Sequence, residues 1–194
     1  MAEYSSLAGP PGAQRVGNDP MRPKATNGIT LHHLCIRIKD PKVSLPFYKE
    51  ILGMRTLFTL NAGPFSVYYM YHSDKENDTQ ETFENFADQK GLLELIHRHG
   101  SENENLEYRS GNELEHQGFG HLGLMVEDVP GTMKRAEEAG YKVIKGLGEA
   151  SSESFGWPEG TPQPNKAYCD LYSKIVMIQG PDNYWFELVP SKIF

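Results

Sequence analysis

The sequence has only two cysteines, no long apolar run, and fewer basic than acidic residues. Cys35 and Cys169 are too few for a disulfide framework, which favours a reducing compartment. The deficit of lysine and arginine gives a formal net charge of −7, which argues against nucleic acid or an anionic membrane as a partner. No apolar stretch approaches the roughly 20 residues of a membrane span. We therefore expect a cytoplasmic protein.

Residues 1–28 differ in composition from the rest of the chain. They contain glycine, proline and serine in no periodic pattern and lack the apolar centre of a secretory signal. We interpret them as a disordered N-terminal tail. The remaining chain is long enough for one ordinary domain or for two small modules that share a core.

A repeated phrase organises the rest of the chain. Residues 33–40 and 121–128 both read His-Leu-x-aliphatic-x-aliphatic-x-Asp. Two further apolar strand segments, around Glu94 and Glu187, each place one glutamate between large apolar residues. The chain therefore predicts two copies of one unit, and each copy contains one strand histidine and one strand glutamate.

The periodicity of each copy predicts the order β-α-β-β-β. We expect the first module over 29–99, a polar linker over 100–117, and the second module over 118–194. In the first module Ser44 is the expected N-cap of the helix, and Gly53 its end. Residues 146–168 predict a long loop. The expected fold class is α+β, with two paired β-α-β-β-β modules that enclose a metal-centred cleft.

The repeated histidines and glutamates are the candidate metal ligands. A single strand histidine is usually a core residue, but a charged carboxylate within an apolar strand is costly unless it is paired or bound to metal. His33 and His121 occupy equivalent positions of the repeat, as do Glu94 and Glu187. Two imidazoles and two carboxylates suit a divalent ion. The remaining histidines have no repeat partner, and strand alternation predicts that His32 points away from the face of His33.

Several further motifs carry a family resemblance. They are Leu31 to Pro41, Phe47-Tyr48, Gly53-Met54, Leu93-Glu94-Leu95 with His97 and Gly100, Gly118-Phe119-Gly120-His121, and Pro181-Asp182 with Tyr184-Trp185 and Glu187. Together they resemble glyoxalase I (lactoylglutathione lyase) of the vicinal-oxygen-chelate superfamily. The resemblance extends from about Leu31 to Val189.

This resemblance implies both a site and a reaction. One divalent ion, with zinc expected and nickel the alternative, would be held by His33, Glu94, His121 and Glu187, usually in a homodimer. The substrate would be the hemithioacetal of glutathione and methylglyoxal, isomerised to S-D-lactoylglutathione. The ion would polarise the substrate oxygens. Glu187 would be the leading base and Glu94 the second.

The organic part of the pocket departs from the family pattern. Arg37 stands where the family has an arginine that grips the glutathione carboxylate, and it shares a face with His33. Arg98 replaces an asparagine that contacts glutathione, and Gln117 replaces an arginine. We expect all three to contact an anionic substrate. Lys145 is a further candidate anion contact, with a surface lysine as the simpler interpretation.

Three alternatives to glyoxalase I stay open. A paralogue could keep the metal and act on another carbonyl compound or carboxylic acid, for example in specialised metabolism. A ring-cleaving dioxygenase fits less well, because such iron sites use two histidines and one carboxylate with open positions. A ligand-sequestering protein of the same fold would not need all four ligands.

Overall fold

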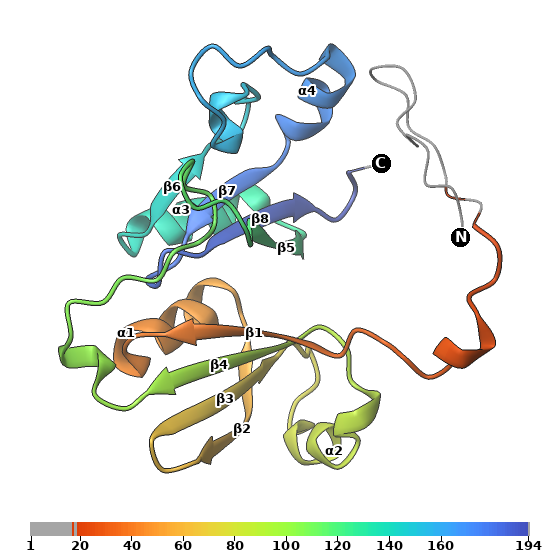
Figure 1. The fold of residues 1–194 in the computed structure, drawn as a ribbon, viewed down its shortest axis with the longest axis vertical. Coiled ribbons are helices and arrows are strands. Elements are labelled where there is room, and N and C mark those ends of the chain that lie inside the picture. Colours follow the sequence, from red (N-terminus) through yellow and green to blue (C-terminus); the bar gives the residue numbers. More distant parts are fainter. Residues whose placement is uncertain (1–16, 18, 194) are drawn as a thin grey trace.

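The computed structural model describes residues 17 and 19–193. Its strands form two separate four-stranded sheets, with the orders β1-β4-β3-β2 and β5-β8-β7-β6 (Figure 1). In each sheet the first and last strands of the module pair in parallel, and the other neighbours pair antiparallel. The prediction of two β-α-β-β-β modules is confirmed. Most of the predicted tail, residues 1–16 and 18, lies outside the described residues. Within its described part a short 3₁₀ turn, η1, spans Lys24–Thr26.

The elements of the two modules follow the repeat in the sequence. The first module contains β1 (His33–Ile38), α1 (Pro41–Pro46), the π-helical η2 (Phe47–Ile51), β2 (Arg55–Asn61), β3 (Phe65–Tyr71), α2 (Thr79–Glu84), η3 (Phe86–Asp88) and β4 (Leu92–Arg98). A 3₁₀ turn, η4 (Ser101–Asn103), begins the linker. The second module contains β5 (His121–Val126), α3 (Val129–Glu138), β6 (Lys142–Lys145), η5 (Glu153–Phe155), α4 (Lys166–Tyr172), β7 (Val176–Gln179) and β8 (Trp185–Pro190).

The aspartate that closes each repeated phrase caps the following helix. Asp40 accepts a hydrogen bond from the Lys42 N–H at 2.9 Å, and Asp128 accepts one from the Gly131 N–H at 2.9 Å. Each satisfies an amide that the first helical turn leaves without a partner. The prediction that Ser44 is the N-cap was wrong, because Asp40 starts the helix one turn earlier. Ser44 is instead buried inside α1.

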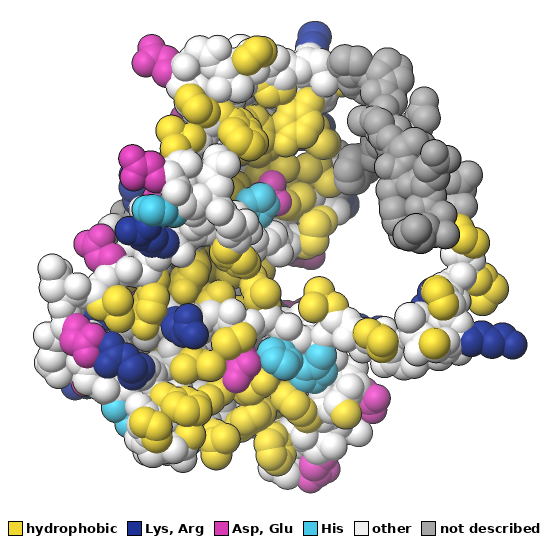
Figure 2. All heavy atoms as spheres, in the orientation of Figure 1, with side chains coloured by type: hydrophobic (Ala, Val, Ile, Leu, Met, Phe, Trp, Pro, Cys, Tyr) yellow, Lys and Arg dark blue, Asp and Glu magenta, His cyan; other side chains and the backbone are white. Residues whose placement is uncertain are grey.

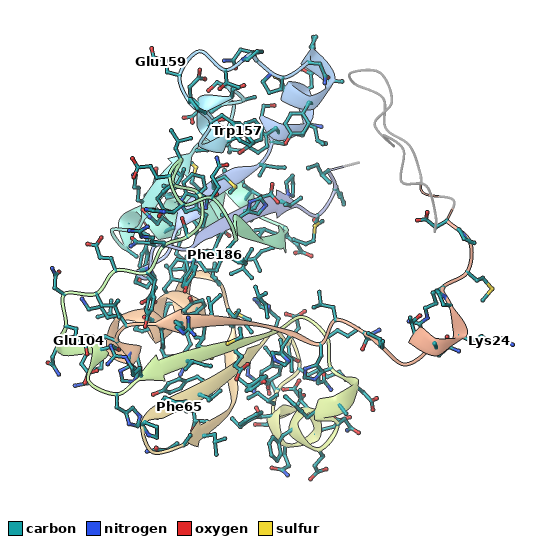
Figure 3. All side chains as sticks on the ribbon, in the orientation of Figure 1. Lys24, Phe65, Glu104, Trp157, Glu159 and Phe186 are labelled. Atoms are coloured by element: carbon teal, nitrogen blue, oxygen red, sulfur yellow. The ribbon has the colours of Figure 1, made fainter. Side chains whose placement is uncertain are left out.

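One hydrophobic core joins the two modules. Alternate residues of β1, β4 and β8 point into it, and the π-helical turn and α3 lie between the sheets. Phe186, fully buried, packs against Phe47 and Tyr48 of the other module with ring centroids 5.0 and 5.9 Å apart. Figure 3 shows Phe186 on the side of the second sheet that faces the first module. Burying such side chains contributes about 1.5–3 kcal/mol each. The opposite face of each sheet therefore remains available for a site.

Hydrogen bonds fix the modules further. The buried Asp182, in the turn between β7 and β8, accepts from the Lys39 N–H at 2.7 Å and from the Ser44 hydroxyl at 2.6 Å. Burial raises the pKa of this carboxyl, and the Ser44 and Lys39 bonds oppose the rise. Arg135 of α3 donates to the Ile51 carbonyl at 3.0 Å. These contacts hold the second module on the first.

The segment between β6 and β7 is more ordered than the predicted loop. It contains η5 and α4, and the helix begins at Lys166 because Asn165 accepts a hydrogen bond from the Tyr168 N–H. Phe155 stacks on Tyr172 with ring centroids 3.8 Å apart. Tyr172 belongs to a small cluster with Met177 and Trp185. This segment therefore packs against the second sheet.

Candidate metal centre

The first sheet brings His33 and Glu94 together. His33 begins the edge strand β1, and Glu94 lies in the neighbouring β4, where its register partner on β1 is Cys35. The His33 Nε2 atom lies 3.3 Å from the Glu94 Oε2 atom. His33 and Cys35 are exposed, while Ile36 and Ile38 on the other face of β1 are buried in the core. Because side chains alternate along a strand, His33 and Glu94 lie on the face of the sheet that points away from the core.

The second sheet repeats this arrangement. His121 begins the edge strand β5, and Glu187 lies in β8 opposite Gly123. The His121 Nε2 atom lies 3.5 Å from the Glu187 Oε2 atom. The hydrogen bond to Glu187 raises the pKa of His121, and partial burial opposes the rise. Figure 2 shows histidine side chains beside acidic ones on both modules, on the same side of the molecule.

The separation in each pair fits a metal ligand set. Two ligand atoms each about 2.1 Å from one ion, with an angle of about 90–110° between them, lie about 3.0–3.4 Å apart. The two observed distances are 3.3 and 3.5 Å. Imidazole nitrogen and carboxylate oxygen are also suitable donors for zinc and other divalent ions. We refer to His33 with Glu94 as the first half-site, and to His121 with Glu187 as the second.

The two half-sites do not meet within one chain. Among the described residues no three histidine, cysteine or acidic side chains come together as a metal-binding group. His33 and His121 do line the same cavity of about 350 Å³ between the modules, together with Leu31, Leu92 and Leu122. Each half-site therefore offers two candidate ligands, and the histidines of both line one cavity.

Polar side chains flank Glu94 on both neighbouring strands. Cys35 is its partner on β1 and Tyr69 its partner on β3. Burial and the adjacent Glu94 carboxylate raise the pKa of Cys35 to about 11 and that of Tyr69 to about 12. Tyr69 stacks on Phe58 with ring centroids 4.7 Å apart. An apolar surface thus adjoins the first half-site.

Glu187 has different neighbours. Its register partners are Gly123 on β5 and Met177 on β7, and neither carries a polar side chain. A β-carbon placed on Gly123 would lie 3.4 Å from the Glu187 Oε2 atom, so glycine leaves this side of the carboxylate open. Tyr168 and Tyr172 of α4 lie near enough that burial, and to a smaller extent the Glu187 charge, raise their pKa values.

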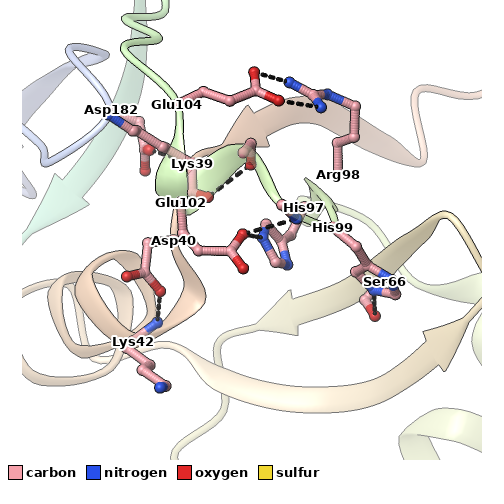
Figure 4. A network of polar contacts seen from close by, with 12 residues as sticks. Lys39, Asp40, Lys42, Ser66, His97, Arg98, His99, Glu102, Glu104 and Asp182 are labelled. Carbon is pink, nitrogen blue, oxygen red and sulfur yellow. Dashed lines mark hydrogen bonds and ion pairs between the residues drawn. The ribbon is translucent and has the colours of Figure 1, made fainter.

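Four residues were expected to contact substrate, and three of them, Arg37, Arg98 and Gln117, are exposed. Arg37 is exposed on the same face of β1 as His33, and its guanidinium forms no ion pair within the described part of the chain. Arg98 is exposed at the end of β4, and both terminal nitrogens of its guanidinium donate to the Glu104 carboxylate (Figure 4). Gln117 is exposed in the segment before β5.

Lys145 has a structural role that the sequence did not indicate. Its side chain is fully buried at the end of β6, and its ammonium donates to the carbonyls of Gly146, Tyr172 and Ile175. Burial lowers its pKa to about 8. All three donors of the ammonium are therefore used to anchor the segment between β6 and β7. The expectation of a surface lysine or an anion contact was wrong.

Sequence reasoning also misplaced His32. This residue precedes β1, so strand alternation does not apply to it. Its Nδ1 atom lies 2.9 Å from the Nδ1 atom of His33, and its Nε2 atom lies 2.8 Å from the Phe86 carbonyl. His32 thus contacts the first half-site instead of pointing away from it. The only signal in the sequence was the adjacent pair of histidines.

The family model for the glyoxalase/bleomycin resistance protein/dioxygenase superfamily matches residues 30–188. The chain belongs to this superfamily. It is 30% identical to a lactoylglutathione lyase of Pseudomonas aeruginosa, with 89% of each chain covered. It is 29% identical to glyoxalase I of Saccharomyces cerevisiae, with 91% of this chain and 47% of the yeast protein covered. The chain thus spans about half the length of the yeast relative.

Solved structures share the fold of this superfamily member. The trypanothione-dependent glyoxalase I of Leishmania major matches with a TM-score of 0.54 at 17% identity, over 84% of this chain and 88% of the other. Glyoxalase I of Zea mays matches with a TM-score of 0.54 at 18% identity, over 84% of this chain and 46% of the maize chain. No helix in the described part of the chain is long and apolar enough to cross a membrane.

Proposed function

We propose that this protein is a metal-dependent lactoylglutathione lyase. The observation that carries the proposal is the pair of matched half-sites, each with a histidine nitrogen 3.3 or 3.5 Å from a glutamate oxygen at the same point of a duplicated sheet. The names of the relatives from Pseudomonas aeruginosa and Saccharomyces cerevisiae support the same activity. The proposed substrate is the hemithioacetal of glutathione and methylglyoxal, and the proposed setting is the cytoplasm.

The complete site would form between two copies of the chain. The shared core and the contacts of Asp182 hold the modules of one chain in place, which opposes closure within a chain. The histidine-bearing strands β1 and β5 are both edge strands, and exposed edges favour pairing with another chain. Leu31, just before β1, and Met125, within β5, are 84% and 64% exposed. A dimer would also have about the length of the yeast relative.

The four residues His33, Glu94, His121 and Glu187 would then hold one divalent ion. Two neutral nitrogen donors and two carboxylates suit zinc, and nickel is the alternative. When bound, such an ion supplies a positive charge that stabilises negative charge developing on the oxygens of the substrate. The protein residues perform the remaining steps.

Glu187 is the proposed proton carrier. The reaction moves a proton from the carbon that bears sulfur and hydroxyl to the adjacent carbonyl carbon. The hydroxyl proton moves to the former carbonyl oxygen, so the isomerisation balances with no other reactant. A base for this task must reach both carbons in turn. Glu187 has the side chain-free Gly123 as one neighbour, which leaves room for movement. Glu94, between Cys35 and Tyr69, is more confined and is the second candidate.

Arg37 is the proposed contact for the carboxylate of the glutathione portion. It is exposed on the open face of β1 and has no ion-pair partner in the described residues. It lies two residues along β1 from Cys35, the register partner of Glu94. A guanidinium fork can bind both oxygens of a carboxylate. Arg98 and Gln117 are weaker candidates, because Glu104 occupies the fork of Arg98 and Gln117 carries no charge.

A second candidate function is the same chemistry on a different carbonyl compound. The observation that favours it is the aromatic segment between β6 and β7, where the exposed Tyr168 lies near Glu187. Such a side chain would favour a bulkier substrate than methylglyoxal. This candidate keeps the metal, the base and the isomerisation.

One assay separates these functions. Metal-free protein is reloaded with zinc or nickel, and turnover is measured with the glutathione hemithioacetals of methylglyoxal and of the bulkier phenylglyoxal. The proposal expects metal-dependent turnover of the methylglyoxal adduct. Metal-dependent turnover of the phenylglyoxal adduct alone would favour the second candidate. A metal-loaded protein that converts neither would contradict both.

A further inference from the structure

The histidine pair His32 and His33 forms a hydrogen-bonded relay that starts at a backbone carbonyl. The His32 Nε2 atom lies 2.8 Å from the Phe86 carbonyl oxygen, and its Nδ1 atom lies 2.9 Å from the Nδ1 atom of His33. The His33 Nε2 atom, on the far side of that ring, faces Glu94 at 3.3 Å. The relay therefore runs from η3 to the first half-site.

When both rings are neutral, as a metal-binding His33 requires, counting protons along the relay gives the tautomer of each ring. A carbonyl oxygen only accepts hydrogen bonds, so the His32 Nε2 atom must carry a proton. A neutral His32 then has only an electron pair on Nδ1, and the bond to His33 requires the proton of His33 to be on its Nδ1 atom. The His33 Nε2 atom is left with a free electron pair. A nitrogen needs that electron pair in order to bind a metal ion.

The relay also restricts the orientation of the His33 ring. The two imidazole planes are perpendicular, with centroids 5.1 Å apart, and His32 is itself held against Phe86 with centroids 4.6 Å apart. His33 additionally meets Tyr69 edge-on at 5.4 Å. These contacts thus hold the His33 ring from the side that would point away from the ion. Such outer contacts usually raise the affinity of a site for its metal.

The second half-site has no such hydrogen-bonded relay in the described residues. The residue before His121 is Gly120, which has a φ of +91° and no side chain. Within the described residues the Nδ1 atom of His121 has no hydrogen-bond partner, while its Nε2 atom faces Glu187. The relay is therefore a property of one half-site, and it does not follow from the repeat.

We propose that His32 is a positioning residue for metal binding, which holds His33 with its proton on Nδ1 and its Nε2 electron pair directed at the ion. This inference rests on the proposed function, because it takes His33 as a ligand. His32 itself would touch neither metal nor substrate. Its contribution would be to preselect the tautomer and the ring orientation that the ion requires.

Two substitutions separate this role from simple packing. His32→Phe keeps an aromatic ring against Phe86 but removes both nitrogens. His32→Gln loses the ring, but its amide can donate to the Phe86 carbonyl and accept from the His33 Nδ1–H. A packing role predicts that phenylalanine is tolerated better than glutamine. The relay predicts the opposite order.

The measurement is the dissociation constant for Zn²⁺ by competition with a chromophoric chelator, on folded full-length protein. We expect His32→Phe to weaken zinc binding by about 10–100-fold, and His32→Gln to stay within about threefold of the wild type. His72→Phe is the matched control, because His72 lies on the same cavity, bonds to the Leu52 carbonyl at 2.8 Å and does not contact His33. It should leave zinc affinity unchanged.

A second readout needs no substitution. In zinc-loaded wild-type protein labelled with ¹⁵N-histidine, a nitrogen–nitrogen coupling across the His33 Nδ1–H···Nδ1 His32 bond is expected. Absence of this coupling, wild-type zinc affinity in folded His32→Phe, or equal loss in both variants would overturn the relay. A wild-type protein that binds no zinc would overturn the metal centre itself, together with the relay. Wild-type zinc binding with unchanged variants would overturn the relay alone.

Discussion

The two half-sites are built on the same plan and differ in what surrounds them. In both sheets a histidine at the start of an edge strand lies beside a glutamate on the next strand. His33 is held from behind by His32, and Glu94 lies between Cys35 and Tyr69. His121 follows a glycine, and Glu187 lies between Gly123 and Met177.

This difference suggests a division of labour. Polar neighbours on both sides restrict Glu94 and His33, as is typical of ligands whose orientation is fixed by a second layer of contacts. An open side at Gly123 suits a carboxylate that must move between two carbon atoms. Under the proposed function, the duplicated module would provide four ligands, with the anchoring role in the first copy and proton transfer in the second.

Exchange of each glutamate for glutamine tests this division most strongly. A glutamine keeps a ligand oxygen but cannot accept the proton. We expect Glu187→Gln to lower kcat by about 10²–10⁴-fold while metal is retained, and Glu94→Gln to lower kcat much less. Single-turnover kinetics with metal content measured on the same samples would check this. Equal losses in both variants would remove the difference between the half-sites.

The comparison also assumes that the half-sites stay apart within one chain. Asp182 accepts two hydrogen bonds from the other module, and losing a hydrogen bond to a charged group costs about 1.5–3 kcal/mol. We expect Asp182→Ala to lower the free energy of unfolding in urea by this amount. Asp128→Ala is the control, because it removes only a helix cap, worth about 1 kcal/mol. An equally small effect at Asp182 would contradict rigid docking of the modules.

A third test concerns the arginines beside the first half-site. Loss of a charge-assisted contact to a substrate carboxylate costs about 1.5–3 kcal/mol. We therefore expect Arg37→Ala to raise KM for a glutathione-linked substrate by about tenfold or more. Arg98→Ala should change KM by less than about threefold, because Glu104 already occupies its guanidinium. A larger effect at Arg98 than at Arg37 would reverse this assignment.

The repeat explains how much of this could be predicted from sequence. Equivalent positions in two copies identified the modules and the pairing of His33 with Glu94 and of His121 with Glu187. Features outside the repeat were missed. Lys145 was expected near the surface because the packing of residues 146–173 over β6 cannot be read from local periodicity. The contact of His32 with Phe86 joins positions 54 residues apart, and no pattern within one strand encodes it.

The helix start shows a similar limit on a smaller scale. Both Ser44 and Asp40 are good N-cap residues, and local preference cannot choose between them. The choice depends on Asp182 in the other module, which accepts a hydrogen bond from the Ser44 hydroxyl. Sequence patterns therefore predicted the elements, and the tertiary contacts that hold the half-sites had to come from the structure.

The central claim, that a working site combines the first half-site of one chain with the second of another, is tested most directly by mixing two inactive variants. One variant carries His33→Ala with Glu94→Gln, and the other carries His121→Ala with Glu187→Gln. After unfolding and refolding together in equal amounts, half of the dimers would be mixed, and each would hold one site with all four native ligands. The account predicts recovery of about a quarter of wild-type activity. Mixed dimers that form and stay inactive would contradict it.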